Sequence, residues 1–132
     1  MFAPDGVGAD EVIISHVGFT ADPVAASDAL FRRGANVSFD RIGSTVFFPD
    51  EHWIALIANA KGHLGKVLLS HDAASFAYGL EMASGENLWD DYRYISRVFL
   101  PRLRSETNVT EEDIHQMLVT NPQRSRKSTR CS

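Results

Sequence analysis

The sequence predicts an α/β fold built on a parallel sheet. Three apolar runs, at residues 12–15, 35–39 and 66–70, have the length and near-continuous hydrophobicity of strands that are buried on both faces. Helix-like segments separate these runs, so consecutive strands are joined by crossovers and run parallel. The predicted order is strand, helix, strand, helix, strand, followed by further helices.

The first predicted helix follows the strand at 12–15. Asp22 suits the N-cap, and Pro23 suits the first helical position, where its missing N–H costs nothing. Gly34 ends this helix after a pair of arginines that favour the negative end of its dipole. The strand at 35–39 then begins directly.

A second helix is predicted from Glu51 to Lys61. Asp50 is expected to cap it and Gly62 to stop it. One face of this helix is apolar and is expected to pack into the core, through Trp53, Ile54, Ile57 and Ala58. The third strand, at 66–70, follows.

The rest of the chain is predicted to form a long loop and two helices. Residues 73–90 contain glycines and scattered aromatics, and loops this long in compact domains are usually lids or binding loops. A third helix is expected at 91–106, bent by Pro101 inside it. A last helix is expected at 111–120, and Asn121-Pro122 is expected to end it.

Composition indicates one globular domain with a basic tail. The 132 residues are 44% hydrophobic and carry a net charge of -4, which argues against nucleic acid as the main partner. No apolar run approaches the ~20 residues that span a bilayer, so no membrane is expected. The single cysteine, Cys131, fits a cytoplasmic setting. We expect residues 1–122 to form the domain and residues 123–132 a disordered tail, with a nucleic-acid or membrane contact of that tail as the alternative.

Ionisable residues follow each of the three predicted strands. His16 follows the first strand, Asp40 and Arg41 follow the second, and His71 and Asp72 follow the third. Because the carboxyl ends of parallel strands meet at one edge of a sheet, these side chains are expected to share one rim. The sequence therefore predicts part of an active site there.

The motifs at these strand ends occur in a characteristic order. The first strand ends in Ser15-His16-Val17-Gly18 and the second in Phe39-Asp40-Arg41-Ile42-Gly43. The later motifs are Ser70-His71-Asp72, Phe99-Leu100-Pro101-Arg102-Leu103 and Thr110-Glu111-Glu112-Asp113-Ile114, with Asn121-Pro122 at the close. Their order and spacing, over roughly residues 6 to 124, resemble the carboxyl-terminal third of the phosphotriesterase family. This family includes the phosphotriesterase-like lactonases of the amidohydrolase superfamily.

The resemblance implies a TIM (β/α)8 barrel with two divalent metals, expected to be zinc, at its carboxyl face. This chain would supply the sixth, seventh and eighth strands with their helices, and so a partial barrel. The implied activity is hydrolysis of a phosphotriester or a lactone, a small-molecule ester, by metal-bound hydroxide.

The resemblance also assigns roles to individual residues. His16 matches the sixth-strand histidine that binds one metal. Asp72 matches the eighth-strand aspartate that binds the other metal and helps activate the hydroxide. Arg41 matches a position, Arg or His in the family, at the substrate end of the proton path. The loop at 73–90 matches one that shapes substrate choice, and Phe19 stands where many members carry an aspartate of the proton path.

The family's other metal ligands are absent from these 132 residues. They are a His-x-His pair, a bridging carboxylated lysine and a further histidine. Because two donors on separate strands rarely hold a divalent ion, we expect weak or absent metal binding and no activity from this fragment alone.

Alternatives to catalysis by this chain stay open. One is a non-catalytic partner that completes a barrel with another chain, or self-associates through open edges at the His16 and His71 strands. Another is an unrelated small α/β binding domain, although no Gly-rich phosphate loop follows the first strand. His16 could instead be a buried histidine and Asp72 a turn cap. His71 is expected to be structural, and Asp40 to make local backbone or ion-pair contacts.

Overall fold

The computed structural model describes residues 6–44, 47–72 and 92–128, and it contains the predicted parallel sheet. The strands are β1 (Ile13–Ile14), β2 (Asn36–Phe39) and β3 (Val67–Leu69), in the order β1-β2-β3. Both pairings are parallel, with Ile13 opposite Asn36 and Val37 opposite Val67. The loop expected at 73–90 lies outside the described residues.

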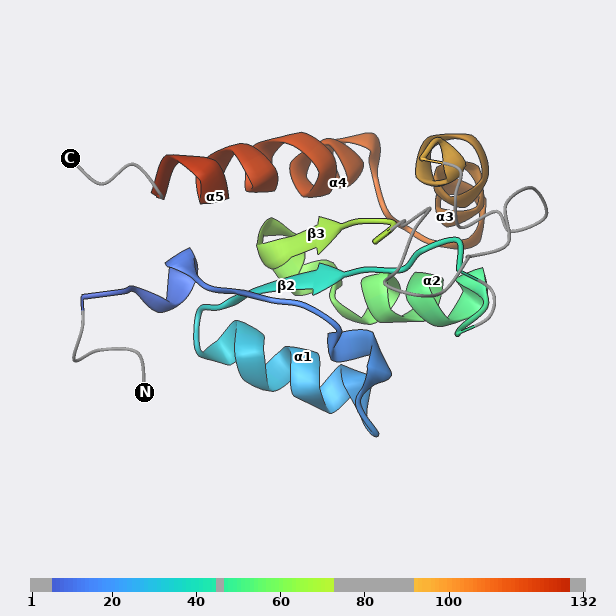
Figure 1. The fold of residues 1–132 in the computed structure, drawn as a ribbon. Helices are drawn as coiled ribbons and strands as arrows, with labels where there is room; N and C mark the ends of the chain where they lie inside the picture. The colour runs from blue at the N-terminus through green and yellow to red at the C-terminus, as the bar shows by residue number, and fades with distance from the viewer. Residues whose placement is uncertain (1–5, 45–46, 73–91, 129–132) are drawn as a thin grey trace, which may run out of the picture.

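Helices lie on both sides of this sheet in the view of Figure 1, with α1 (Pro23–Arg32) and α2 (Asp50–Asn59) below it and α4 (Glu111–His115) and α5 (Asn121–Ser128) above it. The first helix begins as predicted, since the Asp22 side chain accepts a hydrogen bond from the Ala25 N–H at 3.0 Å. The predicted cap of α2 is wrong. Pro49 is its N-cap and Asp50 is its first residue, with a carboxylate that is buried and bonded elsewhere.

One hydrophobic core lies between the sheet and the helices. Most of the apolar face predicted for α2 contributes to it, since Trp53 and Ile57 are fully buried and Ile54 is buried, whereas Ala58 is exposed. In the described part of the chain, β2, the segment after it and the carboxyl-terminal helices add further large side chains with no exposed surface, among them Phe39, Ile42, Phe99, Leu103 and Met117. In the described ranges, no helix combines the length and apolarity that crossing a bilayer requires.

Two prolines in the carboxyl-terminal helices are accommodated by π-helical turns. The π-helix η5 (Ile95–Phe99) leads into α3 (Leu100–Glu106), which contains Pro101. The π-helix η6 (Gln116–Thr120) joins α4 (Glu111–His115) to α5 (Asn121–Ser128), which contains Pro122. A proline has no N–H and its ring collides with the carbonyl four residues earlier, so a wider preceding turn lets the helix continue.

The expected helix end at Asn121-Pro122 is therefore wrong. The helix continues to Ser128, so residues 123–128 are helical, while residues 129–132 lie outside the described part. The division of the chain at residue 122 stays a prediction.

Asn121 attaches this last helix to the sheet. It is fully buried, and its Nδ2 donates to the carbonyls of Leu64 and Val67 at 2.7 Å each. Arg124 Nη2 adds a bond to the carbonyl of Gly65, at the turn before β3. The edge of β3, which was expected to be open, is therefore covered at Val67.

Candidate functional site

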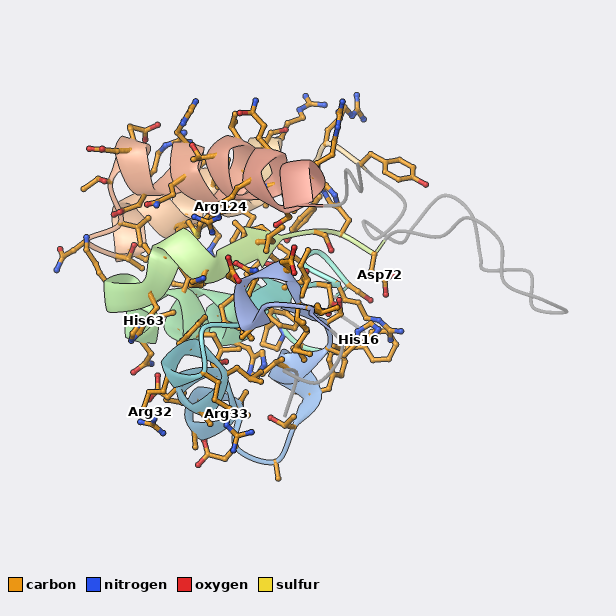
Figure 2. All side chains as sticks on the ribbon, turned by 90° about the vertical axis from the view of Figure 1, so that its left-hand side faces the viewer. His16, Arg32, Arg33, His63, Asp72 and Arg124 are labelled. Atoms are coloured by element: carbon orange, nitrogen blue, oxygen red, sulfur yellow. The ribbon has the colours of Figure 1, made fainter. Side chains whose placement is uncertain are left out.

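The predicted site residues lie at one edge of the sheet. His16 lies two residues beyond β1, Arg41 two beyond β2, and Asp72 three beyond β3. Because all three strands are parallel, these are equivalent ends. Figure 2 shows His16 and Asp72 at the same margin of the molecule, with Arg32 and His63 toward the opposite margin. We call the set of His16, Asp40, Arg41 and Asp72 the rim.

Three rim residues share an unusual backbone conformation. Among the described residues, the non-glycine residues with positive φ are His16 at 61°, Arg41 at 60° and Asp72 at 49°. This left-handed region costs a residue with a Cβ roughly 1–2 kcal/mol. Such residues persist where surrounding contacts fix them, and they gather at functional sites. The three strand ends therefore share a local strain at the residues that the sequence singled out.

His16 is held by Asp40 from the neighbouring strand. The Asp40 side chain is 5% exposed and the His16 side chain 54% exposed. Asp40 Oδ2 accepts the backbone N–H of His16 at 3.0 Å, and Oδ1 lies 3.1 Å from His16 Nδ1. The interpretation of His16 as a buried histidine is therefore wrong. Asp40 was expected to make local contacts, but its contacts are with His16, at the end of the neighbouring strand β1.

Asp72 is held by Arg41. Arg41 Nε donates to Asp72 Oδ2 at 2.9 Å, with the two side chains 28% and 45% exposed. The Arg41 guanidinium carbon also lies 4.5 Å from the ring centre of Phe47 and 5.3 Å from that of Phe19. A cation is attracted to the face of an aromatic ring, so these rings help to fix the arginine.

Phe19 takes part in an aromatic cluster beside the rim. Its ring lies 5.6 Å from that of Phe47, 5.1 Å from that of Phe48 and 5.9 Å from that of Trp53. It also meets His16 edge to face at 6.0 Å. The aromatic side chain thus gives the rim an apolar wall at the position where many family members were expected to carry an aspartate.

The glycines of the strand-end motifs allow aromatic rings to pack against the backbone. A Cβ on Gly18 would lie 2.2 Å from Trp53 Cζ3, and a Cβ on Gly43 would lie 2.7 Å from Tyr94 Cδ1. Gly43 also has a φ of +98°. Any larger residue at either position would therefore displace a buried ring next to the rim.

A buried polar cluster supports Tyr94 in this position. Its hydroxyl donates to Asp50 Oδ2 at 2.8 Å, and Arg102 Nη1 lies 3.6 Å from the same oxygen. Burial, followed by the hydrogen bond to Asp50, raises the pKa of Tyr94 to about 12. Asp50 therefore links the start of α2 to η5, a role that sequence reasoning missed because it treated this residue as a cap.

His71 has a structural contact, as expected. Its Nε2 accepts the backbone N–H of Ile95 at 3.1 Å, at the first residue of η5. This bond ties the end of β3 to the carboxyl-terminal helices.

The rim does not make up a metal site by itself. Within the described ranges, no three His, Cys, Asp or Glu residues are close enough together to hold a metal ion. His16 has one ring nitrogen engaged by Asp40, and Asp72 is paired with Arg41. The described residues thus offer two donors, which is fewer than a zinc site requires. Any divalent metal at this rim would need ligands from outside the described part of the chain.

Comparison with known proteins agrees with the resemblance. The model of the phosphotriesterase family matches residues 1–125. A phosphotriesterase homology protein of Mycobacterium tuberculosis is 33% identical over 128 residues, which are 94% of this chain and 39% of that protein. One from Escherichia coli is 34% identical over 91 residues, which are 67% of this chain and 29% of that protein. The chain thus spans about two fifths of the length of the first relative and less of the second.

Solved structures show the same partial coverage. The phosphotriesterase from Mycobacterium tuberculosis superposes with a TM-score of 0.75 at 32% identity, over 91% of this chain and 38% of that one. A mutant PTE-like lactonase from Deinococcus radiodurans gives a TM-score of 0.75 at 29% identity, over 91% and 40%. The interpretation as an unrelated α/β domain is therefore wrong. The chain belongs to the phosphotriesterase family, and its three parallel strands with their helices are part of that family's TIM barrel.

Proposed function

We propose that this chain supplies part of the active site of a metal-dependent hydrolase that cleaves a phosphotriester or a lactone. In this proposal its strands are the sixth to eighth of the barrel, and these 132 residues are inactive alone. The main support is the rim, where His16 and Asp72 lie at equivalent strand ends, each fixed by a partner. The incomplete donor set among the described residues supports the inactivity. A cytoplasmic location, supported by the single cysteine, is part of the proposal.

In a completed barrel, His16 and Asp72 would serve as metal ligands. Imidazole nitrogen and carboxylate oxygen are both ordinary ligands for zinc, the metal that we propose. A zinc ion supplies a hydroxide nucleophile near neutral pH when it is bound. The remaining ligands would come from barrel strands outside these 132 residues.

Arg41 would position Asp72 and the substrate. A guanidinium is always charged and has no acceptor atom, so Arg41 cannot take a proton from the site. Its Nε is engaged by Asp72. The remaining N–H groups are suited to a phosphoryl or carbonyl oxygen. Phe19 and Phe47, which flank the guanidinium, would contact the apolar substituents of the ester.

The inactivity is tested with the purified chain. It is incubated with zinc or manganese and either an aryl phosphotriester or a lactone. We expect no turnover above the metal-only background. Turnover that Asp72→Ala abolishes, while His115→Ala on an exposed part of α4 retains it, would contradict the inactivity.

The hydrolase role is tested by complementation. The chain is mixed with a polypeptide that carries the first five strand-helix units of a family member, and complex formation is measured by size-exclusion chromatography. We expect the complex to hydrolyse one of the two esters, and His16→Ala and Asp72→Ala to remove the activity. A stable complex that is inactive with either metal would contradict the hydrolase proposal.

A second candidate function is that of a non-catalytic partner in a barrel, and the exposed edge of β1 favours it. The Val12 carbonyl accepts the Asn36 N–H, so Val12 faces β2 and the backbone of Ile13 faces away from it. Ile13 is 41% exposed. Because β3 is covered at Val67, β1 offers the better edge for pairing, whether with another chain or by self-association. A complex that forms without turnover in the natural chain, and that Asp72→Ala leaves intact, would favour this candidate.

A further inference from the structure

We infer that Asp40 is a positioning residue that fixes both the backbone of His16 and the tautomer of its ring. The inference rests on the proposed function only where it assigns His16 to metal binding, because the contacts themselves require no metal. Both oxygens of one carboxylate are used, Oδ2 on the His16 N–H at 3.0 Å and Oδ1 on the His16 Nδ1 at 3.1 Å. With 5% of its side chain exposed, Asp40 is well shielded from water.

The chemistry of the two groups determines where the ring hydrogen lies. An ionised carboxylate only accepts hydrogen bonds, so the nitrogen that faces Oδ1 must carry the hydrogen. A neutral His16 ring therefore has its hydrogen on Nδ1 and a lone pair on Nε2. Histidines that bind metals usually donate their other N–H to a carboxylate or a carbonyl, which fixes the ring and raises its basicity. Asp40 thus leaves Nε2 as the ligand atom.

The second contact of Asp40 stabilises the strained backbone of His16. His16 has a φ of 61°, in the left-handed region that strains a residue with a Cβ. The hydrogen bond from its N–H to Oδ2 offsets part of this strain. The Phe19 ring also contacts the imidazole, nearly perpendicular to it and with the ring centres 6.0 Å apart. The orientation of the ring is therefore set from both the backbone and the side chain.

An asparagine at this position would reverse the tautomer. Asparagine has nearly the shape of aspartate but offers one acceptor and one donor. If its oxygen keeps the bond to the His16 N–H, its NH₂ group faces Nδ1 and donates to it. The ring hydrogen then moves to Nε2, and the atom proposed to bind metal loses its lone pair. Asp40→Asn therefore changes the tautomer of the His16 ring while it keeps a hydrogen-bonding side chain at position 40.

The test is long-range 1H–15N NMR of the histidine rings in the 15N-labelled chain, at a pH at which histidines are neutral. His16→Ala identifies the signals. We expect the hydrogen on Nδ1 in the natural chain and on Nε2 in Asp40→Asn, with an exchange of the two 15N shifts. Asp113→Asn, which alters a capping carboxylate on α4, should leave the His16 shifts unchanged.

Two results would overturn the inference. One is a natural chain with its hydrogen on Nε2 of His16, a measurement that stands even if Asp40→Asn fails to fold. The other is a folded Asp40→Asn variant that keeps the hydrogen on Nδ1. Neither readout needs a metal or a substrate. An inactive complemented barrel would therefore contradict the hydrolase proposal and leave the inference about Asp40 unaffected.

Discussion

Replacing Gly18 by alanine should destabilise the fold through a collision with Trp53. The added Cβ would lie 2.2 Å from Trp53 Cζ3 and 2.6 Å from Cη2. Ordinary carbon contacts begin near ~3.5 Å, so the ring or the backbone would have to move by roughly 1 Å. Trp53 has no exposed surface, and its ring centre lies 6.5 Å from that of Phe39 and 6.0 Å from that of Phe48, so little room is available.

The backbone at Gly18 is equally restricted. Its carbonyl accepts a hydrogen bond from His52 Nε2 at 3.0 Å, and moving the loop would break this bond. Overpacking a core costs about 1–3 kcal/mol, and we expect about 3 kcal/mol here because both sides of the contact are fixed. For a domain of this size, that lowers the melting temperature by roughly 10 °C. Because Gly18 lies two residues after His16, the variant should also disturb the rim.

Urea unfolding followed by tryptophan fluorescence measures this effect. Gly62→Ala is the matched control, because a Cβ there meets nothing within 4 Å and its φ is not positive. We expect the control to unfold at the same or a slightly higher urea concentration. If the free energy of unfolding of Gly18→Ala lies within about 0.5 kcal/mol of that of the natural chain, the packing argument is refuted. A change this small is typical of a surface substitution and not of a collision in the core.

Three further predictions follow from the same structure. Asn121→Ala should lower the free energy of unfolding by about 2–3 kcal/mol in urea titrations, because the carbonyls of Leu64 and Val67 lose their buried donor; an unchanged midpoint would contradict this. The raised pKa of Tyr94 means that the folded state keeps a proton which the unfolded state releases near pH 10, so stability should fall as the pH rises from about 10 to about 12. Thermal melts over that range should show the fall, and Tyr94→Phe should reduce it. Asp72→Gly should be about 1 kcal/mol more stable than Asp72→Ala in urea unfolding, because glycine alone accepts a φ of 49° without strain, and equal stabilities would show that the strain is absent.

The sheet could be predicted from sequence because local signals agreed with each other. The Asp22 cap, the Pro23 start and the apolar run at 35–39 each point to the same strand-helix unit, and the parallel pairing follows from the crossovers. The continued carboxyl-terminal helix could not be predicted in this way. Pro122 is normally a stop signal, and only a π-helical turn, stabilised by the buried contacts of Asn121, lets the helix proceed.

The sequence predicted which residues form the rim but not which contacts join them. Parallel topology alone places His16, Arg41 and Asp72 at one edge, and this requires no knowledge of side-chain contacts. The bond between Asp40 and His16 depends on the register of β1 and β2 and on the turn at each strand end. Sequence spacing of 24 residues carries no such information. The one available signal was an aspartate placed directly after a buried strand, next to the arginine.

The left-handed residues connect the energetics of this fold to its proposed role. Glycine would be the residue of least strain at all three positions, yet the chain has imidazole, guanidinium and carboxylate there. Each is fixed by a contact that crosses to another strand end: Asp40 with His16, and Arg41 with Asp72. The rim contacts therefore offset the energetic cost of the left-handed conformation. Packing of the core alone would not require these contacts. Strain maintained in this way is what a site requires when several strands must direct separate side chains toward one edge.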